Sequence, residues 1–218
     1  MIRAYSGPRT EQKSIKPAVR TFMSGMAQLG PAPVFDAKLA IDDVVRERRP
    51  SPSQINTAIE KITALKDAAW NLNSYENKPG KAADKIKEAV RLAKILYTRE
   101  CTPEVLVVLA NVVAVHADIL NTLANSTKNH DKKTISKELA EGFQMEAGDY
   151  YHSAGDEFLA QGKNKDAGSA FHEAYCAFTT QMNLLSDLGK YASSVNAGTR
   201  AAEMSRKEAA AINPPGAK

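Results

Sequence analysis

The stretch from Glu146 to Tyr175 reads EAGDYYHSAGDEFLAQGKNKDAGSAFHEAY, and its tripeptide Ala-Gly-Asp occurs twice, each time shortly before an aromatic ring. A glycine inside a helix costs about 1 kcal/mol relative to alanine, so this repetition needs a structural reason. Residues three, four and seven apart share one face of a helix. The small residues and rings therefore predict two facing stripes, one of Ala147, Tyr150 or Tyr151, Ala154 and Phe158, the other of Ala167, Ala170, Phe171 and Ala174.

Gly162 separates the two stripes. Glycine adopts the left-handed backbone conformation that closes many helices, so we expect the turn between the two helices at this residue. The pattern predicts three long helices in the last third of the chain, over about 136–161, 165–187 and 190–210.

The order of small residues, rings and turn glycine in this stretch is typical of a helical-hairpin repeat. The run Ala154–Gly155, Phe158, Gly162, Ala167, Phe171 and Ala174 resembles the tetratricopeptide hairpin, and equally the related hairpins of soluble NSF attachment proteins. A second, poorer match begins at Gly189 and includes Tyr191, Ser194, Val195 and Ala201. It begins too soon after the first for a regular array, which favours a hairpin bundle over a repeat solenoid. The resemblance implies a protein-binding scaffold and identifies no partner.

Upstream, helix starts are marked by capping residues followed by proline. Ser51 and Pro52 precede Gln54, which can complete a capping box, and Thr102 and Pro103 repeat the start chemistry. Apolar residues follow at helical spacing, and no segment alternates with a period of two, so no strands are expected. We interpret the polar run 125–134 as a loop before a helix that begins at Ser136.

The sequence thus predicts an all-α protein, either an antiparallel helical bundle or a short tetratricopeptide-like hairpin array, with an extended N-terminal arm. A chain of 218 residues with 43% apolar and 25% charged residues is typical of a globular protein. We expect a flexible basic arm over 1–35, a helical domain over 36–212 and a tail over 213–218. Within the domain, 36–130 would hold the N-terminal helices, the first over 36–48, and 136–212 the hairpins.

One segment is apolar enough to resemble a membrane span. Residues 105–123 read VLVVLANVVAVHADILNTL, but they include His116 and Asp118. Charged groups at the centre of a span cost a few kcal/mol each, so we expect a buried helix and no membrane span. We also expect His116 to be a hydrogen-bonded core residue, and Trp70 to pack in the core. The N-terminus lacks an apolar signal region, and two distant cysteines favour a reducing, cytoplasmic location, although secretion by another route stays open.

The titratable residues indicate no catalytic, cofactor or metal site. His152, Asp149, Asp156 and His172 are close enough in the expected hairpin for a metal site to be conceivable, but their spacing matches no ligand motif, so structural histidines are favoured. Cys176 lies one helical turn from His172, and its apolar surroundings favour a buried packing thiol over a nucleophile. Cys101 precedes a helix start and is at most a reactive thiol.

Basic residues suggest a second class of partner, nucleic acid. The net charge is +4, and the chain has few aromatic residues for base stacking among its basic clusters. A solvated charged surface is therefore favoured over a phosphate-binding one, which would be salt-sensitive. The lysines at 128, 132, 133 and 137 form one cluster. The candidate phosphate contacts are Arg3, Arg9, Lys13, Lys16, Arg20, Arg46, Arg48 and Arg49.

The function expected from the sequence is that of a non-enzymatic interaction scaffold or adaptor with a protein partner and no cofactor. Polar residues between the core stripes are the candidate protein-binding residues: Gln161, Lys163, Asn164, Lys165, Asn183 and Lys190. Two alternatives stay open: a nucleic-acid-associated or assembly-forming, coat-like protein that uses the basic arm, and a secreted bacterial effector of unknown activity. The sequence also leaves open whether the chain forms a homo-oligomer.

Overall fold

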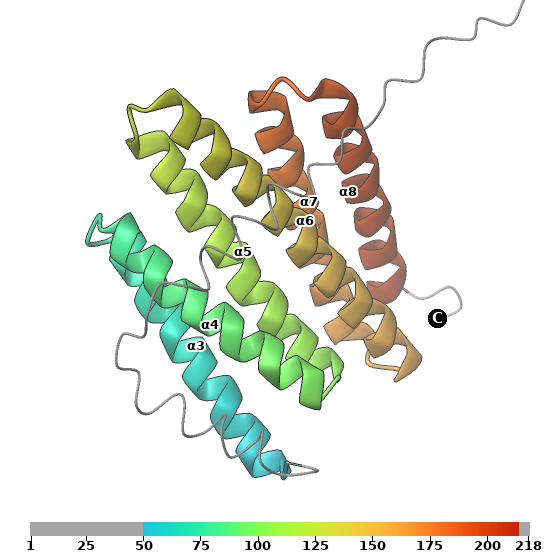
Figure 1. The fold of residues 1–218 in the computed structure, drawn as a ribbon. Helices are drawn as coiled ribbons and strands as arrows, with labels where there is room; N and C mark the ends of the chain where they lie inside the picture. The colour runs from blue at the N-terminus through green and yellow to red at the C-terminus, as the bar shows by residue number, and fades with distance from the viewer. Residues whose placement is uncertain (1–49, 214–218) are drawn as a thin grey trace, which may run out of the picture. The chain divides into compact units, whose positions relative to one another are not determined.

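The computed structural model describes residues 50–213, in which all regular structure is α-helical. The helices in this range are α3 (Pro52–Ser74), α4 (Pro79–Arg99), α5 (Pro103–Ser126), α6 (His130–Ala160), α7 (Asn164–Asp187) and α8 (Tyr191–Ile212) (Figure 1). The predicted all-α class is confirmed, and the described chain is an array of six antiparallel helices. The arm over 1–35, the helix expected over 36–48 and the tail beyond residue 213 lie outside the described residues.

The predicted capping residues begin α3 and α5. The Ser51 hydroxyl accepts a hydrogen bond from the backbone N–H of Gln54, whose side chain accepts one from the N–H of Ser51 in return. The Thr102 hydroxyl accepts the N–H of Val105 in the same way. Each cap provides a partner for an N–H that the first helical turn leaves unpaired, typically a contribution of about 1 kcal/mol.

The predicted start of α6 at Ser136 is wrong. The helix begins at His130, because the side chain of Asn129 accepts the backbone N–H of Lys132 at 2.9 Å. Asn is as good a cap as Ser, but here it stands in a polar run that is exposed on both sides of the helix start. The first turns of α6 thus lack the apolar spacing that indicated the other helices.

Two glycines end α6 and α7 in the same way. Gly162 and Gly189 have φ angles of 73° and 71°, so the expected left-handed turn at Gly162 is confirmed. The N–H of Lys163 then donates to the carbonyl of Phe158, and the N–H of Lys190 donates to that of Leu185. These are the bonds of a Schellman ending, which turns the chain back so that the next helix is antiparallel.

The apolar helix α5 is the central helix of the described part of the chain. It packs against α4 and α6 on either side and against α3 as well. Its length and composition would suffice to cross a membrane, and 56% of its most apolar 18-residue window is buried within the protein. The expectation of a buried helix is therefore confirmed for this segment.

The glycines of the Ala-Gly-Asp repeats are the sites where rings of α7 lie directly on the backbone of α6. A Cβ atom on Gly148 would lie 2.4 Å from Cε1 of Phe178, and one on Gly155 would lie 2.5 Å from Cε1 of Phe171. Both rings are fully buried. Because α6 and α7 are antiparallel, the seven-residue spacing of the glycines matches the seven-residue spacing of the rings. The helix cost of each glycine is thus offset by the burial of an aromatic side chain against it.

A cation from α8 covers each of these rings, and the two cations are again seven residues apart. The Arg200 guanidinium lies 3.9 Å from the Phe178 ring centroid and bonds to Asp149, next to Gly148. The Lys207 ammonium lies 5.3 Å from the Phe171 centroid and 2.8 Å from Asp156, next to Gly155. Two layers of the same composition, a glycine and an aspartate from α6, a phenylalanine from α7 and a cation from α8, therefore join the last three helices.

Two expectations about single core residues are wrong. Trp70 is 40% exposed, because the neighbouring residue Ala69 occupies the buried position on α3 and the next position points about 100° away around the helix. His116 is buried, as expected, but among the described residues neither ring nitrogen has a hydrogen-bond partner. Its ring instead stacks on Phe143, with 4.5 Å between the centroids. Burial, together with the nearby charges of Lys87 and Lys94, lowers the pKa of His116 to about 4, so the ring is neutral at pH 7.

Candidate functional site

Four of the six candidate protein-binding residues lie together at the turn between α6 and α7. Gln161, Lys163 and Lys165 are exposed, and Asn164 is half-buried at the first position of α7. Lys163 also has structural contacts: its Nζ atom lies 2.8 Å from Glu104 at the start of α5 and 5.5 Å from the centroid of the Phe158 ring. Lys163 therefore joins the turn to α5, and the other three residues are the better candidates for contact with a partner.

The other two candidates lie far from this turn. Asn183 is exposed near the C-terminal end of α7, and Lys190 precedes α8 with its Nζ atom 2.9 Å from Glu138 of α6. With a rise of about 1.5 Å per residue, Asn164 and Asn183 are about 28 Å apart along α7. The structure thus divides the six residues between opposite ends of the last hairpins and does not bring them together.

Sequence reasoning missed an exposed apolar pair beside Lys190. Tyr191 is 70% exposed and Val195, one helical turn along α8, is 68% exposed. Both were interpreted as part of the second hairpin match, which would make them packing residues. The structure buries the opposite face of α8 through Ala197, Ala201 and Met204, and no helix within 50–213 covers the outer face. The sequence alone gave no signal for this pair, because Gly198, seven residues after Tyr191 and on the same side of the helix, packs against Met182.

The outer face of α8 continues beyond this pair as small side chains. Ala202 and Ala209 are exposed and follow Val195 at seven-residue intervals, so the three residues form one stripe along the helix. About 100° around the helix from Val195, the hydroxyl of Ser194 donates a hydrogen bond to the carbonyl of Met182 on α7. The stripe is therefore presented by a helix whose other side is held by α7.

The conceivable metal site of His152, Asp149, Asp156 and His172 is not formed. The ammonium of Lys207 lies 2.6 Å from Nε2 of His152 and 2.8 Å from Asp156. A cation of the protein itself therefore contacts both of these side chains, and Asp149 pairs with Arg200. Across 50–213, no group of three or more His, Cys, Asp or Glu side chains is arranged to hold a metal ion.

The expectation of a buried packing thiol at Cys176 is wrong. Cys176 is exposed, because the buried positions of this part of α7 are Ala174 and Ala177. Its Sγ atom lies 3.8 Å from Nε2 of His172, and Nδ1 of His172 lies 3.2 Å from the Glu208 carboxylate of α8. Partial burial, with the nearby Glu173 and Glu208 carboxylates, raises the pKa of Cys176, so the thiol is protonated at neutral pH. Cys101, at the start of α5, is exposed as well.

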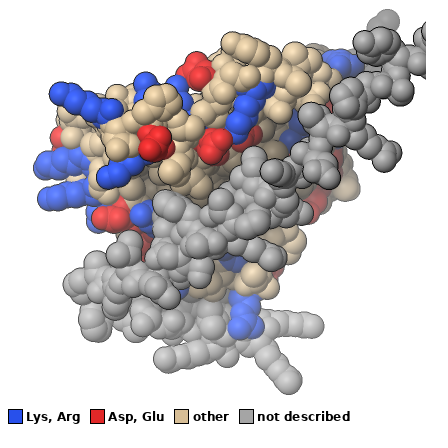
Figure 2. Space-filling view, turned by 45° about the horizontal axis from the view of Figure 1, so that its top comes forward, with Lys and Arg blue, Asp and Glu red and all other residues tan. Residues whose placement is uncertain are grey.

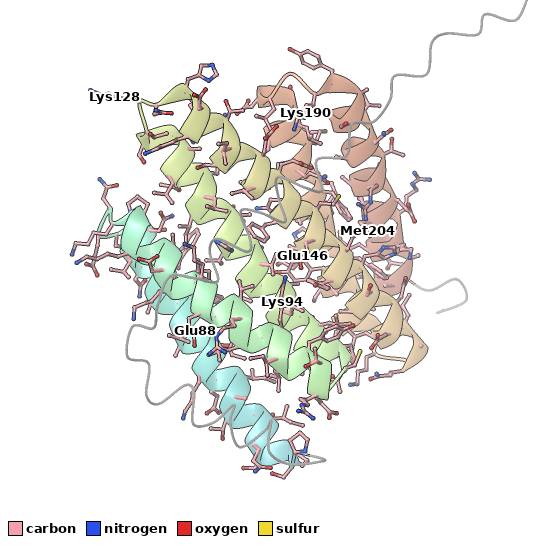
Figure 3. All side chains as sticks on the ribbon, viewed as in Figure 1. Glu88, Lys94, Lys128, Glu146, Lys190 and Met204 are labelled. Carbon is pink, nitrogen blue, oxygen red and sulfur yellow. The ribbon has the colours of Figure 1, made fainter. Side chains whose placement is uncertain are left out.

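The remaining polar contacts inside the array are structural. The amide of Gln144 on α6 donates to the Asp118 carboxylate of α5 at 3.0 Å, and the Tyr151 hydroxyl donates to Asn111 of α5 at 3.0 Å. Burial raises the pKa of Asp118 to about 6, although the bond from Gln144 acts in the opposite direction. Lys94 of α4 and Glu146 of α6 point toward one another, 2.7 Å apart (Figure 3).

All of the candidate phosphate contacts lie outside the described residues, so they stay a prediction. Lys128, Lys132 and Lys133 are exposed around the start of α6, whereas Lys137 pairs with Asp187 at 2.5 Å. Figure 2 shows Lys and Arg side chains crowded at one edge of the face in view, with Asp and Glu among them over the rest. Over 50–213 the basic and acidic residues nearly balance, and this part of the chain has no large excess of positive charge.

Comparison with known proteins assigns this chain to no family. No protein-family model matches the chain, and no curated protein matches it. Among solved structures, a chain described as "DHF58 filament" is similar, with a TM-score of 0.49 and 18% sequence identity over 90% of this chain and 82% of that one. The resemblance to tetratricopeptide and soluble NSF attachment protein hairpins therefore rests on the residues quoted for it.

Proposed function

We propose that this protein is a protein-binding helical scaffold and that the outer face of α8 is its contact surface. The observation that carries the proposal is the exposure of Tyr191 and Val195, at 70% and 68%, one turn apart on a helix whose opposite face is buried. Tyrosine is enriched among the residues that dominate binding energy at protein interfaces. The polar residues Asn183 and Lys190 lie at the same end of the hairpin and would form part of the rim.

The occupant that fits this surface is an α-helix of the partner protein. The stripe of Val195, Ala202 and Ala209 has the seven-residue spacing of a helix-packing seam, and its alanines allow another backbone to approach closely. An amphipathic helix that docks on an apolar face is a common mode of recognition. Tyr191 would be the large anchor at one end of this seam.

The surface is held on a rigid base. Arg200 and Lys207 fasten α8 to α6 across the buried rings of α7, and Gly189 fixes the turn that begins the helix. A site on a supported helix keeps its geometry before the partner arrives, which limits the entropy that binding costs.

The expected loss of affinity follows from the apolar side chains that a partner would cover. Full burial of a Val or similarly large apolar side chain contributes about 1.5–3 kcal/mol, so loss of both Tyr191 and Val195 should weaken binding by about 3 kcal/mol or more. This corresponds to a decrease in affinity of at least about 100-fold.

The test is quantitative affinity purification from native cell extract with the wild-type chain, a Tyr191→Lys/Val195→Lys variant and a Tyr75→Lys control. Tyr75 is 81% exposed at the end of α3, so the control changes exposed aromatic surface elsewhere. We expect one stoichiometric protein that the wild type and the control retain and the double variant loses.

Three results would contradict the proposal. One is equal retention of the partner by all three proteins. Another is self-association of the purified chain, measured by sedimentation, that the double variant abolishes, since the occupant would then be a second copy. The third is the recovery of nuclease-sensitive, salt-released nucleic acid in place of a protein, which would favour the basic arm as the binding element.

A further inference from the structure

We propose that His172 and Cys176 form a surface site for a zinc-class divalent ion. The two residues are four apart on α7, so their side chains project from the same helix face. Thiolate sulfur and imidazole nitrogen are the donors that such ions prefer. This site lies on α7 and involves none of the residues assigned to partner binding.

The separation of the two donor atoms suits a shared ion. Zinc lies about 2.3 Å from a thiolate sulfur and about 2.0–2.1 Å from an imidazole nitrogen, so tetrahedral geometry places the donors about 3.6 Å apart. The Sγ atom of Cys176 and Nε2 of His172 are 3.8 Å apart. An ion between them requires only a slightly wider angle at the metal, without movement of the α7 backbone.

Glu208 of α8 orients the histidine for this role. Its carboxylate lies 3.2 Å from Nδ1 of His172. Because a carboxylate only accepts hydrogen bonds, Nδ1 carries the ring proton and donates a hydrogen bond to Glu208. The lone pair is then on Nε2, which faces the sulfur of Cys176. A carboxylate on the other ring nitrogen is the usual support of a metal-binding histidine, and it also raises the basicity of the donor atom.

The charge around the pair is suited to a cation. Within 50–213, the carboxylates of Glu173 and Glu208 both act on the Cys176 thiol. Binding releases the thiol proton to solvent, and the thiolate forms the bond to the metal. The two nitrogens of His172 point in opposite directions, so Glu208 cannot join His172 and Cys176 on one ion. Two protein donors leave the remaining positions open to water or to a donor from another molecule.

The chain allows a clean experiment, because it has only two cysteines and four histidines. Purified protein under reducing conditions is titrated with Co²⁺, whose bond to thiolate gives a charge-transfer absorption, and the bound Co²⁺ is then displaced with Zn²⁺. The variants are Cys176→Ser, His172→Gln and Glu208→Gln. Cys101→Ser and His130→Gln are matched controls, since both residues are exposed and neither belongs to the pair. Circular dichroism verifies that each variant is folded.

We expect one ion per chain with a thiolate band in the wild type and in both controls. Cys176→Ser should lose the band, and His172→Gln should weaken binding at least tenfold. Glu208→Gln should keep the band and weaken binding by roughly 10–100-fold, as expected of a positioning residue. The absence of a thiolate band in the wild type would overturn the proposal, and so would a band that survives Cys176→Ser or an affinity unchanged in His172→Gln. In those cases the 3.8 Å contact is only a thiol hydrogen bond.

Discussion

Substitution of Gly155 by alanine is expected to destabilise the protein, although alanine is the better helix former. The added Cβ would lie 2.5, 2.7 and 2.9 Å from three atoms of the Phe171 ring. All three distances are shorter than carbon atoms tolerate. The ring is fully buried and has the Lys207 ammonium 5.3 Å from its centroid, so it cannot move aside without disturbing α8 as well.

The same helix contains a matched control. At Gly142, also within α6, an added Cβ meets nothing within 4 Å. Gly142→Ala should therefore show the gain in helix propensity alone, an increase of about 1 kcal/mol in the free energy of unfolding. Gly155→Ala makes the same gain but adds overpacking, which costs about 3 kcal/mol at the upper end of the usual range. The net loss is about 2 kcal/mol, and the two variants should differ by about 3 kcal/mol.

The assay is urea denaturation followed by far-ultraviolet circular dichroism, with thermal unfolding as a second measure. For a chain of this size, a difference of about 3 kcal/mol corresponds to roughly 6–12 °C in Tm. Phe171→Leu combined with Gly155→Ala should recover part of the loss that Gly155→Ala causes on its own. The reasoning is refuted if Gly155→Ala is as stable as Gly142→Ala, because the Phe171 ring would then not require a residue without a side chain at position 155.

Three further predictions concern buried and bridging charges. The pKa of Asp118 is raised from 3.8 to about 6, so its contribution to stability is present below pH 4 and is lost as pH rises through 6. Asp118→Asn should therefore raise the unfolding free energy at pH 7 by an amount on the order of 3 kcal/mol and remove this pH dependence, which denaturation at a series of pH values measures. The pKa of His116 is lowered from 6.5 to about 4, so stability is complete above pH 6.5 and is lost as pH falls toward 4. His116→Leu should reduce the acid sensitivity in that interval, and an unchanged pH profile would show that the ring is solvated. Lys207→Met removes the ammonium that contacts both His152 and Asp156, and it should cost about 0.5–1 kcal/mol at low salt because these groups are partly exposed. Denaturation of wild type and variant at low and high salt should show the difference shrinking as salt is added, and a salt-independent difference would assign the loss to packing on Phe171.

Local signals predicted most of the helices correctly. The starts at Ser51 and Thr102 and the turn at Gly162 follow from hydrogen bonds between residues three to five apart, which short sequences specify. Asn129 uses the same chemistry, but no apolar pattern beside it distinguished the cap from the rest of a polar loop. The candidate binding residues were less predictable, because exposed polar residues occur at both ends of every hairpin.

The sequence by itself determined the all-α class and the helix boundaries at Ser51, Thr102 and Gly162, because each depends on contacts within a few turns of one chain segment. It also indicated that small residues and rings would face one another across the last hairpin, because the helical repeat places each set on one face. The tertiary structure decided which ring lies on which glycine, since the pairs Gly148–Phe178 and Gly155–Phe171 depend on the register of two antiparallel helices. It also decided that Cys176 is exposed beside His172. A helical repeat indicates which residues share a face, but only the neighbouring helices determine which face is covered. For that reason the open face of α8 was visible only in the assembled array.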